Sequence, residues 1–146
     1  AFLGQVWAPT GRPVSALAVA SNPDSENGRV HVVFAQERSM IWCSVSLHTS
    51  KGHSSSPLKV LRSLTIEHAH SALVKYIAAA RLEANPAGIS FLSCGSDGHV
   101  YRWQVMDSPE APVDATVTGA STDGAVLAPG RPKRQLLFSH PCDQPL

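Results

Sequence analysis

The sequence has few charged residues, few aromatic residues and few cysteines. Charged residues make up 16% of the 146 and hydrophobic residues 43%, which excludes the self-repelling polar composition of a disordered chain over most of the length. The formal net charge of +1 lacks the basic excess of a dedicated nucleic-acid or anionic-membrane binder. The length allows one compact domain. We therefore expect partners to be recognised by shape.

The three cysteines, Cys43, Cys94 and Cys142, are odd in number and widely spaced. They form neither the paired framework of a small secreted domain nor a C-x-x-C zinc pair. No apolar run reaches the roughly 18 residues that cross a bilayer, and the first residues lack the basic and apolar regions of a signal peptide. We expect reduced thiols and an intracellular protein, cytoplasmic or nuclear, that does not enter a membrane.

A hydrophobic pattern occurs twice, about sixty residues apart, and this is the main organising feature of the chain. The first copy runs from Val14 to Trp42 and the second from Val74 to Trp103, with Val-to-Trp separations of 28 and 29 residues. Each copy contains three β segments with a turn before the last, and period-two alternation over 58–66 adds a fourth. The sequence predicts an all-β fold of four-stranded antiparallel sheets.

Residues 69–84 conflict with this pattern, because their apolar side chains also recur at helical spacing. Ser71 is a possible helix cap and Asn85 precedes a proline that would stop a helix. The equivalent segment 14–20 is short, β-branched and ended by its own Asn-Pro. For this reason we predict a strand here as well.

The segment from Gly95 to Trp103 resembles a blade of the WD-repeat β-propeller family, whose consensus places a turn Asp six residues before a strand Trp. His70 lies in an Ala-His pair where the family usually has Gly-His, and Ser93 falls on the preceding strand. The resemblance covers about 14–106. It implies that His70, Ser93, Asp97 and Trp103 form the structural hydrogen-bonded tetrad of the family.

The tetrad has a physical rationale. A buried indole N–H needs an acceptor, a serine hydroxyl can accept from it and donate to an imidazole, and the other ring nitrogen can donate to a carboxylate. The first copy departs from this pattern, because Thr10, Val32 and Gln36 occupy the His, Ser and Asp positions and leave only Trp42. We expect that copy to depend on apolar packing.

The implied architecture is an incomplete WD-repeat propeller of two to two and a half blades over 1–106. We expect blades at about 14–66 and 74–118, an edge strand at 2–7 before them, and an edge strand followed by a Pro-rich, flexible tail in 107–146. A closed propeller needs at least about four blades. We therefore expect the chain to be part of a larger propeller, or to be completed by a partner chain or by self-association.

The resemblance implies a non-catalytic scaffold or adaptor that mediates protein–protein interactions in a multiprotein complex through its blade rims, with no cofactor and no metal. Residues 134–138 also resemble the short R-x-L-x-F motif that docks to cyclins. The candidate interaction residues on predicted loops and in this motif are Arg12, His48, Lys51, His53, His68, His99, Arg134, Leu136 and Phe138.

Two other function classes remain as alternatives. A small β-domain could stack single-stranded nucleic acid on Tyr76, Tyr101 and Trp103, with Arg102 beside them, although the balanced charge disfavours nucleic acid.

A hydrolase could use the hydroxyl, base and carboxylate of Ser93, His70 and Asp97, although no G-x-S-x-G elbow accompanies them. Glu67, His68, His70 and His99 could also suggest a metal site, in which His68 and His70 would share a strand face, but no third ligand is fixed by spacing. No phosphate-binding glycine loop occurs.

Overall fold

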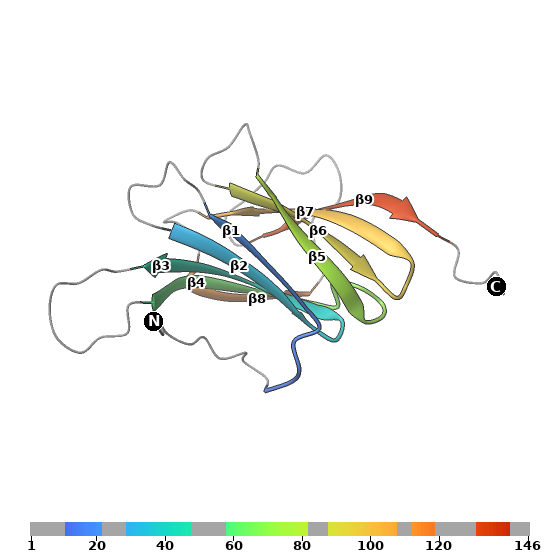
Figure 1. Cartoon of the computed structure of the whole chain (residues 1–146), viewed down its shortest axis with the longest axis horizontal. Coiled ribbons are helices and arrows are strands. Elements are labelled where there is room, and N and C mark those ends of the chain that lie inside the picture. The colour runs from blue at the N-terminus through green and yellow to red at the C-terminus, as the bar shows by residue number, and fades with distance from the viewer. Residues whose placement is uncertain are drawn as a thin grey trace, which may run out of the picture.

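The computed structural model describes residues 11–21, 29–47, 58–81, 88–107, 112–118 and 131–140. In these ranges the chain is all-β and forms two sheets, of order β1-β2-β3-β4-β8 and β5-β6-β7-β9 (Figure 1). The strands are β1 (Ala16–Ser21), β2 (Arg29–Gln36), β3 (Ser39–Leu47), β4 (Leu58–Glu67), β5 (Val74–Arg81), β6 (Gly88–Gly95), β7 (His99–Met106), β8 (Asp114–Thr118) and β9 (Lys133–Ser139).

Within the same ranges no helix has the length and hydropathy needed to span a bilayer. The expected edge strand at 2–7 lies outside the described residues, as do Thr10, His48, Lys51, His53 and Cys142.

The segment with conflicting periodicity is a strand. β5 pairs antiparallel with β6 from Val74 to Arg81, and Ile77 lies opposite Ser93. The small side chains that gave the helical spacing alternate between the two faces of the sheet, with Ala78 exposed and Ala79 partly buried. The prediction of a strand is confirmed, because burying one face against the first sheet outweighs local helix propensity.

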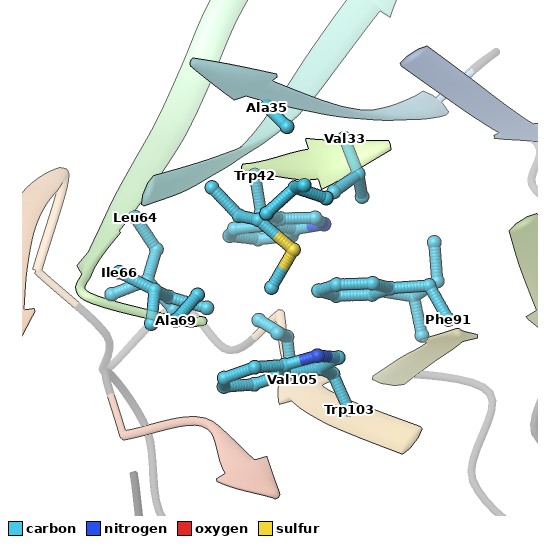
Figure 2. Close-up of a cluster of buried hydrophobic side chains, with 12 residues drawn as sticks. Val33, Ala35, Trp42, Leu64, Ile66, Ala69, Phe91, Trp103 and Val105 are labelled. Atoms are coloured by element: carbon cyan, nitrogen blue, oxygen red, sulfur yellow. The ribbon is translucent and has the colours of Figure 1, made fainter. Parts of the chain in front are cut away.

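The two sheets pack face to face and enclose one hydrophobic core (Figure 2). β1 and β5 provide the closest approach between them, and Ser15 Oγ donates to the carbonyl of Val74 at 2.8 Å where the two strands begin. The core consists of Val33, Ala35, Met40, Trp42, Leu64, Ile66, Ala69, Val74, Ile89, Phe91, Trp103 and Val105. Except for Ala69, which lies in the β4–β5 connection, these side chains come from strands and follow the period of two expected for one face of a strand.

The outer face of the first sheet carries a second apolar cluster, formed by Phe34, Ile41, Cys43 and Val45. On β1 the same face exposes Leu17. Both faces of this sheet are therefore apolar, which is typical of a sheet in the interior of a layered structure rather than of a sheet with one solvated face.

The two tryptophans are not equivalent positions of the repeat. Trp42 and Trp103 both point into the core between the sheets, from opposite sides. In the first sheet, the cross-strand row Leu17–Phe34–Ile41 faces outward. In the second sheet, the row Ile77–Ser93–Tyr101 faces the core. Ile77 on β5 and Tyr101 on β7 each lie sixty residues after their counterparts on β1 and β3. This offset of sixty aligns Cys43, not Trp42, with Trp103.

The alignment of the two tryptophans was therefore wrong by one residue. A slip of one residue turns a strand side chain to the other face of the sheet. In these rows, the residue of the first sheet that corresponds to Ser93 of the second sheet is Phe34, not Val32 as the sequence alignment had it.

The expected second blade at 74–118 also needs correction. β8 does not join the second sheet but pairs parallel with β4 at the edge of the first, where Ala115 and Val117 pack against the core. Ser63 Oγ donates to Asp114 at 2.9 Å along this pairing. The fourth strand of the second sheet is β9, which pairs antiparallel with β7.

The segment 107–146, expected to be an edge strand followed by a flexible tail, thus contributes two strands. The sequence predicted one edge strand in this segment and not β9, and a local pattern does not specify which sheet edge a strand joins.

Candidate functional site

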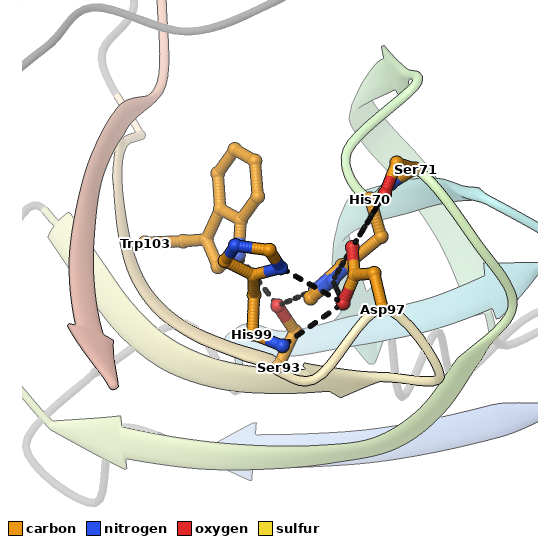
Figure 3. A network of polar contacts seen from close by, with 6 residues as sticks. All are labelled: His70, Ser71, Ser93, Asp97, His99 and Trp103. Carbon is orange, nitrogen blue, oxygen red and sulfur yellow. Dashed lines mark hydrogen bonds and ion pairs between the residues drawn. The ribbon is translucent and has the colours of Figure 1, made fainter. Parts of the chain in front are cut away.

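The side chains of His70, Ser93, Asp97 and Trp103 form one hydrogen-bonded chain beside the core (Figure 3). Trp103 Nε1 on β7 donates to Ser93 Oγ on β6 at 2.8 Å. His70 Nε2 lies 2.7 Å from the same oxygen, and His70 Nδ1 lies 3.0 Å from each carboxylate oxygen of Asp97. His70, Ser93 and Trp103 are at most 2% exposed. The β4–β5 connection, β6, the β6–β7 turn and β7 therefore meet at this network.

The direction of each hydrogen bond follows from the ionisation of the two titratable members. Burial lowers the pKa of His70 below 6.5, an effect that Asp97 opposes. Neutral His70 donates from Nδ1 to the carboxylate and accepts at Nε2 from the hydroxyl of Ser93. Every polar atom along the chain then has a partner of the right kind.

Asp97 is the acceptor for several further groups. Burial on its own raises the pKa of Asp97, but hydrogen bonds from the His70 side chain and from the backbone N–H groups of His99 and Ser71 outweigh it and lower that pKa to about 2. The N–H groups lie 3.1 Å and 3.0 Å from the carboxylate. Asp97 therefore stays ionised and closes the β6–β7 turn as well as the tetrad.

Gly95 makes the close approach of His70 and Asp97 possible. A Cβ added at Gly95 would lie 2.5 Å from His70 Nδ1 and 2.7 Å from Asp97 Oδ1. No side chain fits this position without displacing the network. Sequence reasoning placed Gly95 only in a turn and missed this role, although its place two residues before Asp97 was a usable signal.

An aromatic and cationic stack covers the network. The Tyr101 ring lies 4.9 Å from that of His70, edge to face, and 5.6 Å from that of His99, stacked. The guanidinium of Arg134 on β9 lies 4.6 Å from the centre of the Tyr101 ring and 5.9 Å from that of Trp103. Cation–π contact of this kind holds β9 against the tetrad.

A second polar cluster joins the two sheets at the other end of β7. Asp107, 4% exposed, accepts from Arg29 at 2.9 Å, from Arg62 at 3.0 Å and from Ser44 at 2.9 Å. All three donors belong to the first sheet, whereas Asp107 follows the last residue of β7. Sequence reasoning assigned Asp107 to the start of the tail and did not identify this ion-paired link between the sheets.

Among the described residues, the equivalent face of the first sheet has no such polar chain, and Phe34, Ile41 and Cys43 pack there instead. Burial raises the pKa of the Cys43 thiol to about 11, with a contribution from Asp114. On the core side, no hydrogen-bond partner for Trp42 Nε1 or His31 Nδ1 lies among the described residues. Their rings stack at 5.7 Å.

The turns at one end of the two sheets meet around residues 67–74. His70 N donates to the carbonyl of Arg38, Val74 N to that of Glu37 and Ser96 N to that of Leu73. The exposed residues of this end, which we call the turn rim, are Glu37, Arg38, Glu67, His68, Ser71, Leu73 and Ser96.

The candidate interaction residues fall into two groups. Arg12 lies at the turn rim, where it pairs with Glu37 at 2.7 Å, and His68 and His99 lie at the same end. Arg134, Leu136 and Phe138 lie on β9. His68 does not share a strand face with His70 as expected, because the segment is a turn in which His68 has a φ of 52°.

No three His, Cys, Asp or Glu side chains in the described ranges are grouped as metal ligands.

The chain has no significant match to any family model, to any curated protein sequence or to any solved structure.

Proposed function

We propose that the protein is a non-catalytic scaffold of the WD-repeat type, whose turn rim binds other proteins. The observation that carries the proposal is the chain from Trp103 through Ser93 and His70 to Asp97, because it links β6, β7, the β4–β5 connection and the β6–β7 turn by directional bonds. Such a network fixes the position of the turns that it joins. A fixed set of turns suits recognition by shape.

The relation between the faces of the two sheets supports the same proposal. Residues on the outward face of the first sheet correspond, sixty residues later, to residues on the core face of the second sheet. Two successive propeller blades are related by a rotation, which brings the far face of one blade onto the near face of the next. The outer row of the second sheet, formed by Tyr76, Cys94, Val100 and Phe138, would be the face that a further blade covers. Additional blades, a partner chain or a second copy would each supply that cover.

The geometry of Ser93, His70 and Asp97 also has the connectivity of a hydrolytic triad, which makes the hydrolase the second candidate. Burial argues for the scaffold, because the Ser93 hydroxyl is 1% exposed and already accepts from Trp103. A nucleophile needs an open approach to its substrate.

Two of the aromatic side chains that the nucleic-acid alternative requires are not available for stacking with bases. Trp103 is fully buried, and Tyr101 is stacked between neighbours that include Arg134 and His99.

Site-specific photo-crosslinking in cell extract tests the scaffold function. A photoreactive amino acid at Arg38 or Ser71, both in the turn rim, is expected to capture a discrete set of proteins, and the added substitution Leu73→Asp is expected to abolish capture. Lys59 is the matched control position, exposed on β4 away from the rim. Equal capture from Lys59 would refute a rim-specific interaction.

Labelling with a fluorophosphonate separates the scaffold from the hydrolase. The folded protein is expected to remain unlabelled. Labelling of the wild-type protein that disappears in the Ser93→Ala variant would reject the scaffold proposal in favour of the hydrolase.

A further inference from the structure

The outer edge of β9 is apolar and unpaired. β9 is the last strand in its sheet, bonded to β7 on one side and to no described strand on the other. Leu136, Leu137 and Phe138 are consecutive and are 50%, 49% and 56% exposed. The register shifts between Val100 and Tyr101, so Leu137 has no partner on β7. An edge of this kind presents free N–H and C=O groups for a further strand.

The charged side chains of β9 and of the residues just before it are all positive. Residues 131–140 contain Arg131, Lys133 and Arg134 and no acidic residue. Arg134 is held over Tyr101, whereas Arg131 is exposed, and no ion pair neutralises Arg131 or Lys133 within the described ranges. The edge therefore offers apolar contacts beside uncompensated positive charge.

This charge selects among possible occupants. An antiparallel pair of two β9 strands would bring the cations of both copies into one small interface, and lysines on edge strands are a known protection against such self-pairing. A strand that carries carboxylates gains attraction at the same positions. A strand in which apolar residues alternate with acidic ones can contact the exposed leucines and also pair its carboxylates with the cations.

We propose that the outer edge of β9 binds an extended acidic and apolar segment of another protein, which adds to the second sheet as a fifth strand. Its backbone pairs with the outward N–H and C=O groups of β9, and its apolar side chains contact Leu136, Leu137 and Phe138. Its carboxylates lie beside Arg131 and Lys133. This surface is separate from the turn rim, so it goes beyond the scaffold function proposed above.

The same residues do not suit the R-x-L-x-F docking motif as β9 stands. A docking protein could bind this motif as a free peptide only if Arg134 left the Tyr101 ring and β9 separated from β7. Strand addition requires neither change.

Peptide binding to the full chain tests the proposal. The probe is a fluorescent synthetic peptide of alternating Val and Asp, N-methylated at alternate residues so that only one edge can pair. We expect saturable binding by fluorescence anisotropy, loss of affinity with added salt, and slowed hydrogen exchange at the β9 amides that point away from β7. The double variant Arg131→Glu with Lys133→Glu is expected to bind about tenfold more weakly.

Three controls make the result decisive. Lys75→Glu reverses an exposed charge on the same sheet and should leave binding unchanged. A peptide with Lys in place of Asp should bind about tenfold more weakly than the acidic one. Equal binding of the two peptides, protection outside β9, or concentration-dependent self-association that protects β9 without any peptide would each overturn the proposal.

Discussion

Trp42 and Trp103 enter one hydrophobic core from opposite sheets, but only Trp103 has its indole N–H hydrogen-bonded to a described residue. The two residues share size, chemistry and burial, at 2% and 0% exposure. They therefore provide a matched pair for measuring what the polar network contributes beyond packing.

Replacing each tryptophan by phenylalanine should have unequal effects. Trp103→Phe removes the donor to Ser93 and is expected to cost about 1 to 3 kcal/mol of unfolding free energy, the usual penalty for disrupting a buried hydrogen bond. Trp42→Phe removes a donor that satisfies no described acceptor and should cost about 1 kcal/mol less. Urea unfolding followed by circular dichroism measures both, and equal losses would contradict the assigned role of the network.

Gly95→Ala should disrupt the tetrad without changing any of its members. The added Cβ would contact His70 and Asp97 at impossible distances, so we expect a loss of about 1 to 3 kcal/mol from overpacking. In NMR spectra, the Trp103 indole N–H resonance should shift and lose its protection from exchange. Ser96→Ala, at an exposed neighbour in the same turn, is the control and should leave that resonance in place.

Stability should fall in two stages as the pH is lowered. The folded-state pKa values of His70 and His31 are lowered by burial, so the unfolded chain binds protons first and stability declines below about pH 6.5. The pKa of Asp97 is lowered from 3.8 to about 2, so its contribution is present above about pH 4 and is lost as the pH falls through about 2.

Thermal unfolding across pH measures this profile. The variant Asp97→Asn should remove the lower stage. A stability that rises between pH 7 and pH 5 would contradict the assigned neutral state of the buried histidines.

Asp107 should matter more to stability than an exposed ion pair. Asp107→Ala leaves Arg29 and Arg62 without the carboxylate that joins them, and we expect a loss of about 2 to 3 kcal/mol. Glu37→Ala breaks the exposed pair with Arg12 and should cost at most about 1 kcal/mol. Similar losses for the two variants in chemical unfolding would exclude a special role for Asp107 in joining the sheets.

The sequence by itself identified most of the strands and, through its resemblance to a WD-repeat blade, the members of the tetrad. Period-two alternation is a local property, so it identified the segments that became β1 to β7 even where the alanines of β5 suggested a helix, whereas β9 lies in the segment that was expected to be a flexible tail. The resemblance to a WD-repeat blade implied the four members of the network, of which Ser93 and Trp103 lie on adjacent strands and Asp97 lies in the turn between them.

Only the tertiary structure decided which sheet each late strand joins and which face each tryptophan occupies. β8 completes the edge of the first sheet and β9 that of the second, a choice made by long-range packing of Ala115 and Val117 and by Arg134 on Tyr101. The alignment of Trp42 with Trp103 failed because a single residue of register reverses the face of a strand, and turn length alone does not reveal that slip. Gly95 and Asp107 acquire their roles from neighbours distant in sequence, which no local pattern encodes.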